Sequence, residues 1–398
     1  MMRKPLFLTS LALVLLSHGL AYSQTGIRKS VSVSAPTRLD WKFAVSGFGA
    51  NAAKLPGDYD SKKQTYFLYV PKTYQPNRDW PLIAFISPGN GPAGWNNWKS
   101  VCEKHGVLFC SPYKAGNKVA AGQRTRIVLD MLDDVRRKYR IDPDQTYLGG
   151  FSGGGRMSCT IAYSLPELFG GVVPVCGTNP LPRLTYLKHR LQDRLSVAFV
   201  TGEKDFNRKE NEKYMYPYFK ELDIRTKLWV AKKVGHSIPS GMVLEEVYLW
   251  LKEDLPHRKK DRGIYPKLQV TANKTPDAEE QANLMLQTAQ LELNNPMNVW
   301  RGVALAQGVM NRWPKSKSAT AAKMLLQAAL QDPKSIRAIE QQGGQYERRF
   351  LSAQAKALER FGLLPQARQA WQILAKTHPD SPEGKLAKEA IQRLKGNN

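Results

Sequence analysis

Two patterns of apolar and polar positions alternate between residues 64 and 255. Continuous apolar runs closed by Pro, Gly or polar residues predict buried strands, whereas apolar residues repeating every three or four positions predict amphipathic helices. We predict strands at 64–70, 81–86, 106–110, 146–151, 171–176, 195–200 and 227–230. We predict helices at 96–105, 123–139, 153–162, 210–222 and 241–255. This alternation indicates an α/β domain with a doubly wound, mostly parallel sheet covered by helices on both faces.

The N-terminal segment has a different composition. Arg3 and Lys4 precede an apolar run from Leu6 to Ala21, and small residues stand three and one positions before Gln24. This order predicts a secretory signal peptide over residues 1–23. The alternative is a membrane anchor, but the apolar core is short and ends in a site typical of cleavage. We therefore expect an exported protein, periplasmic or extracellular, without a membrane span once the signal peptide is removed.

The pattern also sets the limits of the predicted domains. Residues 24–39 are polar and Ser-rich and predict a flexible leader, and from Trp41 the pattern predicts an extended chain. The α/β domain is expected to cover residues 40–257. The charged stretch that follows predicts a linker over residues 258–276, because it lacks a periodic apolar pattern.

Residues 277–398 are rich in Ala, Gln, Leu and Lys and show no strand signal, which predicts an all-helical domain of six or seven helices. An internal repeat is visible: residues 304–316 align with 369–381, each a helix stopped by Pro and followed by Ser. The offset is close to two tetratricopeptide repeats, and residues 367–394 resemble such a helical pair, whereas residues 341–344 fit it poorly. The region is then either an array that binds a protein partner or a structural appendage.

The charge of the chain bears on its partners, and its cysteines bear on zinc binding and disulfides. The formal net charge is +25, and most of the excess lies in residues 24–274. A basic surface can attract anionic polymers, but no nucleic-acid-binding module is recognisable, so we expect no nucleic-acid partner. Export would permit disulfides, but the spacing of Cys102, Cys110, Cys159 and Cys176 matches no zinc site, and their apolar surroundings favour buried thiols.

A strand, a tight turn and a helix surround one serine at residues 146–162. Gly150 to Gly154 fit the pattern G-x-S-x-G around Ser152. In a nucleophile elbow the serine stands on a sharp turn that leaves no room for larger neighbours. The following helix directs its first N–H groups toward developing negative charge. The sequence therefore predicts Ser152 as a nucleophile.

A serine nucleophile needs a base and an acid that orients the base. Of the six histidines, His236 stands in a loop at the carboxyl end of a predicted strand, before the last helix of the domain. The acid is expected between Ser152 and His236, after another strand. Asp205 and Glu203 both follow the strand at 195–200, and the spacing from Gly202 favours Asp205.

The order Ser152, Asp205, His236, with the elbow glycines and Gly202, resembles the α/β-hydrolase superfamily. Within it, the chain resembles exported, lidless esterases of the polyhydroxybutyrate depolymerase and feruloyl esterase group, over roughly residues 60–255. Relatives usually carry His-Gly where this chain has Pro88-Gly89, so the oxyanion loop departs from the family pattern. By position, we assign the oxyanion hole to the backbone N–H groups of Gly153 and Asn90.

The resemblance implies a serine esterase that forms an acyl-enzyme and needs no metal or organic cofactor. The substrate is expected to be an ester, either small or carried on a polymer or polysaccharide. Two alternatives remain open: a serine peptidase on the same scaffold, and a non-enzymatic protein that binds partners through its helical domain. Because all triad candidates precede residue 258, we expect a chain without residues 275–398 to keep ester hydrolysis.

Overall fold

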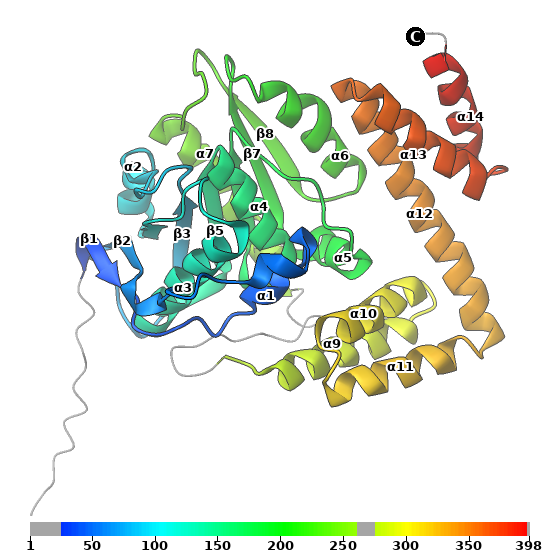
Figure 1. Cartoon of the computed structure of the whole chain (residues 1–398), viewed down its shortest axis with the longest axis horizontal. Coiled ribbons are helices and arrows are strands. Elements are labelled where there is room, and N and C mark those ends of the chain that lie inside the picture. The colour runs from blue at the N-terminus through cyan, green and yellow to red at the C-terminus, as the bar shows by residue number, and fades with distance from the viewer. Residues whose placement is uncertain (1–24, 261–274, 396–398) are drawn as a thin grey trace, which may run out of the picture.

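An eight-stranded sheet forms the centre of the N-terminal part of the protein (Figure 1). The computed structural model describes residues 25–260 and 275–395, so the predicted signal peptide and residues 261–274 lie outside it. The strand order is β1-β2-β4-β3-β5-β6-β7-β8; β2 pairs antiparallel with β1 and β4, and all other pairs are parallel. The strands are β1 (Gly26–Ser32), β2 (Thr65–Val70), β3 (Trp80–Ile86), β4 (Leu108–Pro112), β5 (Ile141–Phe151), β6 (Gly171–Val175), β7 (Ser196–Gly202) and β8 (Thr226–Ala231).

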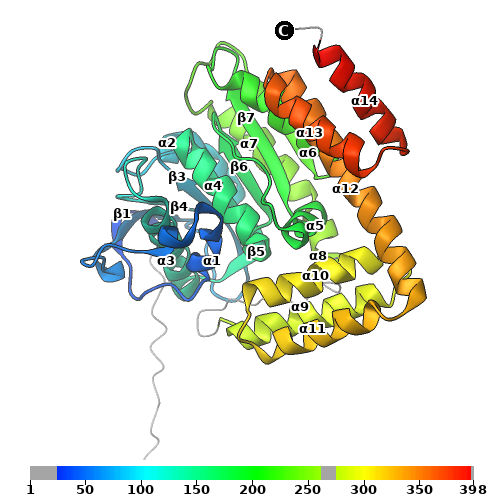
Figure 2. The ribbon, with the colours of Figure 1, turned by 45° about the vertical axis from the view of Figure 1, so that its right-hand side comes forward.

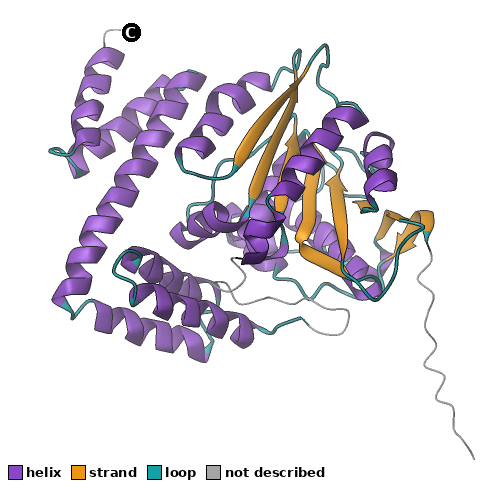
Figure 3. Cartoon of the chain, turned by 180° about the vertical axis from the view of Figure 1, so that it is seen from behind, coloured by secondary structure: helices purple, strands orange, loops and turns teal. Residues whose placement is uncertain are grey.

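Helices cover both faces of this sheet (Figure 3). One core lies between the sheet and α3, α4 and α6, and a second core lies between the opposite face and α2 and α7. The mostly parallel α/β architecture is thus confirmed, and it fits the α/β-hydrolase fold. The helices of this part are α2 (Trp95–His105), α3 (Ala121–Lys138), α4 (Gly153–Ser164), α5 (Thr185–Arg194), α6 (Tyr216–Glu221), α7 (Gly241–Glu253) and α8 (Leu255–Lys260). Among the described residues, no helix is both long and apolar enough to span a bilayer.

Residues 25–39, within the segment predicted as a flexible leader, form a strand and a hydrogen-bonded loop. β1 pairs with β2, and the residues after it bind acidic side chains of α3. The N–H groups of Ser34, Thr37 and Arg38 donate to carboxylates of α3 at 2.8, 2.7 and 2.8 Å. These acceptors lie about a hundred residues away in sequence, so the local polar composition did not reveal them.

The pattern predicted an extended chain after Trp41, but the structure has short helical turns between Trp41 and Lys63. Asp40 caps the first of these turns by accepting the N–H of Phe43 at 3.2 Å. Trp41 and Ala44 are buried in the core beside α3, which explains why their apolar character does not reflect a strand. The turns are α1 (Trp41–Ala44), η1 (Ser46–Phe48), η2 (Ala50–Ala53) and η3 (Ser61–Lys63); later short turns are η4 (Pro166–Leu168) and the π-helix η5 (Glu210–Met215).

Six helices make up the described C-terminal residues 275–395. Figure 2 shows α10 beside α5 with α9 and α11 packed on α10, α12 passing α6, and α13 and α14 at the upper end of α12. Asp277 begins the region with a capping box, in which its carboxylate and that of Glu280 bind each other's backbone N–H. The helices are α9 (Ala278–Leu293), α10 (Val299–Arg312), α11 (Lys317–Ala329), α12 (Pro333–Phe361), α13 (Leu364–Thr377) and α14 (Pro382–Lys395).

The C-terminal helices share apolar cores with the α/β part. Phe350 and Ala353 of α12 are buried in the core that also contains α6, and Tyr186 of α5 is buried among α9 and α10. The predicted linker also begins later than expected, because α8 continues to Lys260 and the Arg258 guanidinium is fully buried. The two sequence regions therefore pack as neighbours with common cores rather than as separate bodies joined by a tether.

The tetratricopeptide likeness is not supported in the middle of the helical region. A repeat would need a turn near the predicted misfit at residues 341–344, but α12 runs through it without a break. The glycine at residue 343 leaves room for the indole of Trp300, because a Cβ there would lie 3.0 Å from that ring. The tetratricopeptide assignment therefore stays a prediction, while the all-helical composition is observed.

The four cysteines are free and buried in the structure. Cys102, Cys110 and Cys159 lie in α2, β4 and α4, and Cys176 directly follows β6. Their apolar surroundings raise the pKa of each thiol, which disfavours the reactive thiolate.

Candidate active site

Ser152 stands on a strained turn between β5 and α4. Its φ of 54° and ψ of −120° place a non-glycine residue in a region that side chains rarely adopt. A Cβ on Gly150 would lie 2.3 Å from the Gly154 carbonyl, and a Cβ on Gly154 would lie 2.0 Å from the Ile86 carbonyl oxygen. The two glycines of the motif are therefore required by close backbone contacts, as a nucleophile elbow demands.

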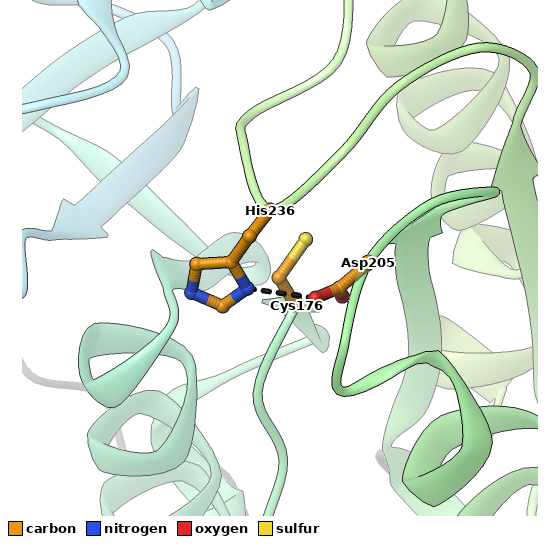
Figure 4. Close-up of side chains that lie close together, drawn as sticks. All are labelled: Cys176, Asp205 and His236. Atoms are coloured by element: carbon orange, nitrogen blue, oxygen red, sulfur yellow. Dashed lines mark hydrogen bonds and ion pairs between the residues drawn. The ribbon is translucent and has the colours of Figure 1, made fainter.

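His236 bridges Ser152 and Asp205. Its Nε2 lies 3.0 Å from Oγ of Ser152, and its Nδ1 lies 2.7 Å from Oδ1 of Asp205 (Figure 4 shows the second contact). The three residues follow β5, β7 and β8, whose carboxyl ends meet at one edge of the sheet. The structure thus brings all three predicted residues into one hydrogen-bonded relay, which we call the Ser–His–Asp relay.

The Asp205 carboxylate is well supplied with donors. Its Oδ2 accepts the hydroxyl of Thr201 at 2.7 Å, and its Oδ1 accepts the N–H of Asn207 at 3.0 Å besides His236. Burial by itself would raise the pKa of Asp205, but these hydrogen bonds outweigh it and hold the pKa below its usual value. Asp205 is therefore an anion that can accept a hydrogen bond from the protonated Nδ1 of His236.

The competing acid and the other described histidines lie elsewhere. Glu203 is exposed and accepts the N–H of Lys233 at 2.8 Å rather than a histidine. His105 and His378 contact glutamates of other helices, and burial lowers the pKa of His189 to about 4. Within residues 25–260 and 275–395, only His236 combines a serine on one ring nitrogen with a carboxylate on the other.

The two expected oxyanion donors lie at the start of α4 and in the loop that follows β3. Gly153 is the first residue of α4, where a backbone N–H has no acceptor within the helix. Ile86 pairs with Gly150, so the loop from Ser87 to Asn90 leaves β3 beside the elbow. The Gly89 N–H is already used by the Ser87 hydroxyl at 3.0 Å, which leaves the Asn90 N–H as the next donor along that loop.

Two aromatic rings that the sequence did not single out flank His236. Phe206 stacks on the imidazole with ring centroids 4.1 Å apart and an angle of 25°, and Phe151 lies 4.9 Å away at a tilt. Phe206 is nonetheless 76% exposed, so its outer face is open to solvent. The position of Phe206 directly after Asp205 and that of Phe151 directly before Ser152 could have indicated both rings.

Cys176 lies behind the relay. In the described residues its sulfur, a carboxylate oxygen of Asp205 and a ring nitrogen of His236 lie within 4.8 Å of one another, the arrangement that Figure 4 draws. Cysteine, aspartate and histidine can ligate zinc, but here Asp205 and His236 are hydrogen-bonded to each other. Burial and the neighbouring Asp205 also raise the pKa of Cys176 to about 12, which opposes the thiolate that a metal requires. The group is therefore better suited to the relay than to a metal.

Asn117 is a further neighbour of the elbow that the sequence did not indicate. It lies in the loop between β4 and α3, and its side-chain amide rests against Gly153. Only the tertiary contact between this loop and α4 reveals it, because no motif marks the residue.

Curated relatives of the chain include polyester depolymerases. It is 32% identical to a poly(3-hydroxybutyrate) depolymerase of Ralstonia pickettii over an alignment of 110 residues that covers 24% of this chain and 22% of that protein. It is 24% identical to poly(3-hydroxyalkanoate) depolymerase C of Paucimonas lemoignei over 177 residues, which are 38% of this chain and 40% of that protein. Both matches span less than half of the relative's length. No protein-family model matches the chain.

Solved structures with a similar shape include esterases. A ferulic acid esterase aligns at a TM-score of 0.40 with 14% identity, covering 48% of this chain and 92% of the esterase. An S-formylglutathione hydrolase from Staphylococcus aureus aligns at a TM-score of 0.39 with 12% identity, covering 47% of this chain and 92% of that enzyme. Both alignments cover less than half of this chain.

Proposed function

We propose that this chain is an exported serine hydrolase that cleaves carboxylic esters through Ser152, His236 and Asp205. The observation that carries the proposal is the continuous Ser–His–Asp relay, with hydrogen-bond distances of 3.0 and 2.7 Å, on a strained elbow. An unaided serine hydroxyl is a weak nucleophile at neutral pH, so a base within hydrogen-bond reach is the minimum requirement for this chemistry.

Acylation follows from this geometry. Oγ of Ser152 attacks the ester carbonyl carbon while Nε2 of His236 takes the hydroxyl proton, and the carbonyl electron pair moves onto oxygen. The N–H groups of Gly153 and Asn90 stabilise that oxyanion; one such donor is typically worth about 3 kcal/mol. When the oxyanion collapses, the C–O bond to the alcohol breaks and His236 returns the proton to the leaving oxygen.

Deacylation repeats these steps with water. His236 takes a proton from water, the resulting hydroxide attacks the acyl carbon, and the proton passes back to Oγ as the acid leaves. Asp205 remains an anion throughout: it holds Nδ1 of His236 in the protonated tautomer and stabilises the imidazolium that forms in both half-reactions. The low pKa of Asp205 supports this role.

The proposed substrate comes from the curated relatives, and the proposed site of action comes from the N-terminal sequence. The depolymerase relatives favour an ester, and among esters they favour a polymeric hydroxyalkanoate. Export is supported by the N-terminal pattern of basic, apolar and small residues. The shared cores favour a supporting role for the C-terminal helices over the binding of a protein partner.

A panel of p-nitrophenyl esters and a fluorophosphonate probe test this proposal. We expect the purified protein to hydrolyse activated short-chain esters and to be labelled at Ser152, and Ser152→Ala to lose both properties while remaining folded. Hydrolysis of peptide amides without ester turnover would instead favour the peptidase alternative. A folded parent protein with neither activity nor labelling would reject the proposal.

A further inference from the structure

Asn117 lies on a loop that is tied to the expected oxyanion loop. The Asn117 N–H donates to the Pro88 carbonyl at 2.8 Å, and the Lys114 N–H donates to the Asn90 carbonyl at 2.7 Å. A Cβ on Gly116 would lie 2.7 Å from the Asn90 side chain, so that side chain packs closely against the backbone of the neighbouring loop. These contacts hold Asn117 in a defined position relative to the start of α4.

The side chain of Asn117 fills the space beside the first residue of α4. A Cβ on Gly153 would lie 2.0 Å from Oδ1 and 2.6 Å from Nδ2 of Asn117. Gly153 has no positive φ, so a larger residue there would meet no backbone strain but would displace the amide of Asn117. Gly153 is also the residue whose N–H is expected to donate a hydrogen bond to the oxyanion.

Nothing else in the described part of the chain engages this amide. Asn117 is exposed, and its side chain forms no hydrogen bond with the residues that the structure describes. A side-chain amide carries two N–H donors and one acceptor, and its oxygen and nitrogen can exchange places by rotation about the last side-chain bond. A hydrogen-bond donor is therefore available beside Gly153.

We propose that the side-chain amide of Asn117 donates a hydrogen bond to the oxyanion, beside the N–H groups of Gly153 and Asn90. This inference rests on the proposed serine hydrolase function. A hydrogen-bond donor at the position of developing charge stabilises the transition state more than the neutral ester, so it acts mainly on kcat. It also offers a chemical reason for the glycine after the nucleophile, since any side chain at residue 153 would displace the donor.

Two variants separate hydrogen-bond donation from packing. Asn117→Ala removes the amide, whereas Asn117→Asp keeps its shape but presents an acceptor-only carboxylate. Loss of one oxyanion donor typically lowers kcat by about 10²–10³-fold, so we expect falls of that order in both variants. KM should stay close to the parent value, and inhibition constants for a trifluoromethyl ketone should rise in parallel with the loss of kcat. Asn311→Ala, an exposed asparagine of α10, is the matched control and should behave as the parent.

The measurements are kcat, KM and the inhibition constant on one activated ester, with thermal unfolding to confirm the fold. An Asn117→Ala enzyme within about threefold of the parent in kcat would overturn the proposal, because that change is far below the loss expected for a donor. So would full activity in Asn117→Asp, since shape alone would then suffice. Either result leaves the proposed function intact if the parent is labelled by a fluorophosphonate, whereas an unlabelled, inactive parent would reject both.

Discussion

A buried ion pair joins the C-terminal helices to the α/β part of the protein. Nη2 of Arg312 in α10 lies 2.7 Å from Oε1 of Glu167 in η4, and the two side chains are 1% and 5% exposed. Arg190 lies 3.9 Å from the other carboxylate oxygen of Glu167. Burial alone would raise the pKa of Glu167, but the charges of Arg312 and Arg190 and the hydrogen bond from Arg312 lower it. Glu167 is therefore held as an anion inside the protein.

We predict that Arg312→Met destabilises the whole chain and not only its helical region. Removing one partner of a buried pair leaves an uncompensated charge, which costs about 3–5 kcal/mol. Typical unfolding free energies are about 5–15 kcal/mol, so this loss would be a large fraction of the total. It corresponds to a fall in Tm of roughly 5 to 15 °C.

Urea unfolding followed by tryptophan fluorescence and by circular dichroism measures this effect. Arg393→Met removes a partner from the exposed pair of Arg393 and Glu359, and we expect a change below about 1 kcal/mol for that control. The double variant Arg312→Met/Glu167→Gln should be less destabilised than the sum of its two single variants, because neither member of the pair is then left as a charge without the other.

The pH dependence of this effect has a defined sign. Because the folded pKa of Glu167 is depressed, its contribution to stability is present above the unfolded value, about 4.3, and is lost as the pH falls through the folded pKa. The difference between the parent and Arg312→Met should thus be largest near neutral pH and shrink below about pH 4. An Arg312→Met protein within about 1 kcal/mol of the parent at pH 7 would refute the reasoning.

The same packing changes the expectation for a shortened chain. The sequence suggested that removing residues 275–398 would preserve hydrolysis, because the triad candidates all precede that region. The structure now predicts that such a chain loses its fold, because Phe350 would leave the main core and Glu167 would lose Arg312. Soluble, active protein from residues 24–274 would contradict this prediction.

Three further changes test the site. Asp205→Asn should lower kcat by about four orders of magnitude by favouring the wrong tautomer of His236, a magnitude taken from a serine protease, whereas Glu203→Gln should cost little. Kinetics on one ester would reassign the acid if the two results were reversed. Gly154→Ala should prevent formation of the elbow, since its Cβ would lie 2.0 Å from a β3 carbonyl oxygen; a stable, probe-labelled variant would argue against that close contact. Phe206→Ala should lower kcat/KM about two- to tenfold by removing the ring stacked on His236, with activity kept in Phe206→Tyr, and equal losses in both variants would oppose this role.

Local sequence determined the alternation of strand and helix and the order of the candidate triad. Apolar runs such as 195–200 are buried on both faces in β7, so a continuous apolar run predicts a strand whichever elements pack against it. Gly150 and Gly154 mark the elbow because backbone atoms leave no room there for a side chain. Ser152, Asp205 and His236 follow strands, and parallel strands bring their carboxyl ends together. These features depend on short stretches of chain and on one general rule of topology.

Tertiary structure alone decided the remaining features, because each depends on residues far apart in sequence. Ser34 is ordered by an acid a hundred positions away, and Asn117 reaches Gly153 only because two loops are hydrogen-bonded to each other. The ion pair between Glu167 and Arg312 spans 145 positions and joins regions that composition had separated. Polar and charged side chains of this kind show no periodicity, and their burial is acceptable only when a distant partner compensates it. Their roles therefore emerge only when the chain has folded.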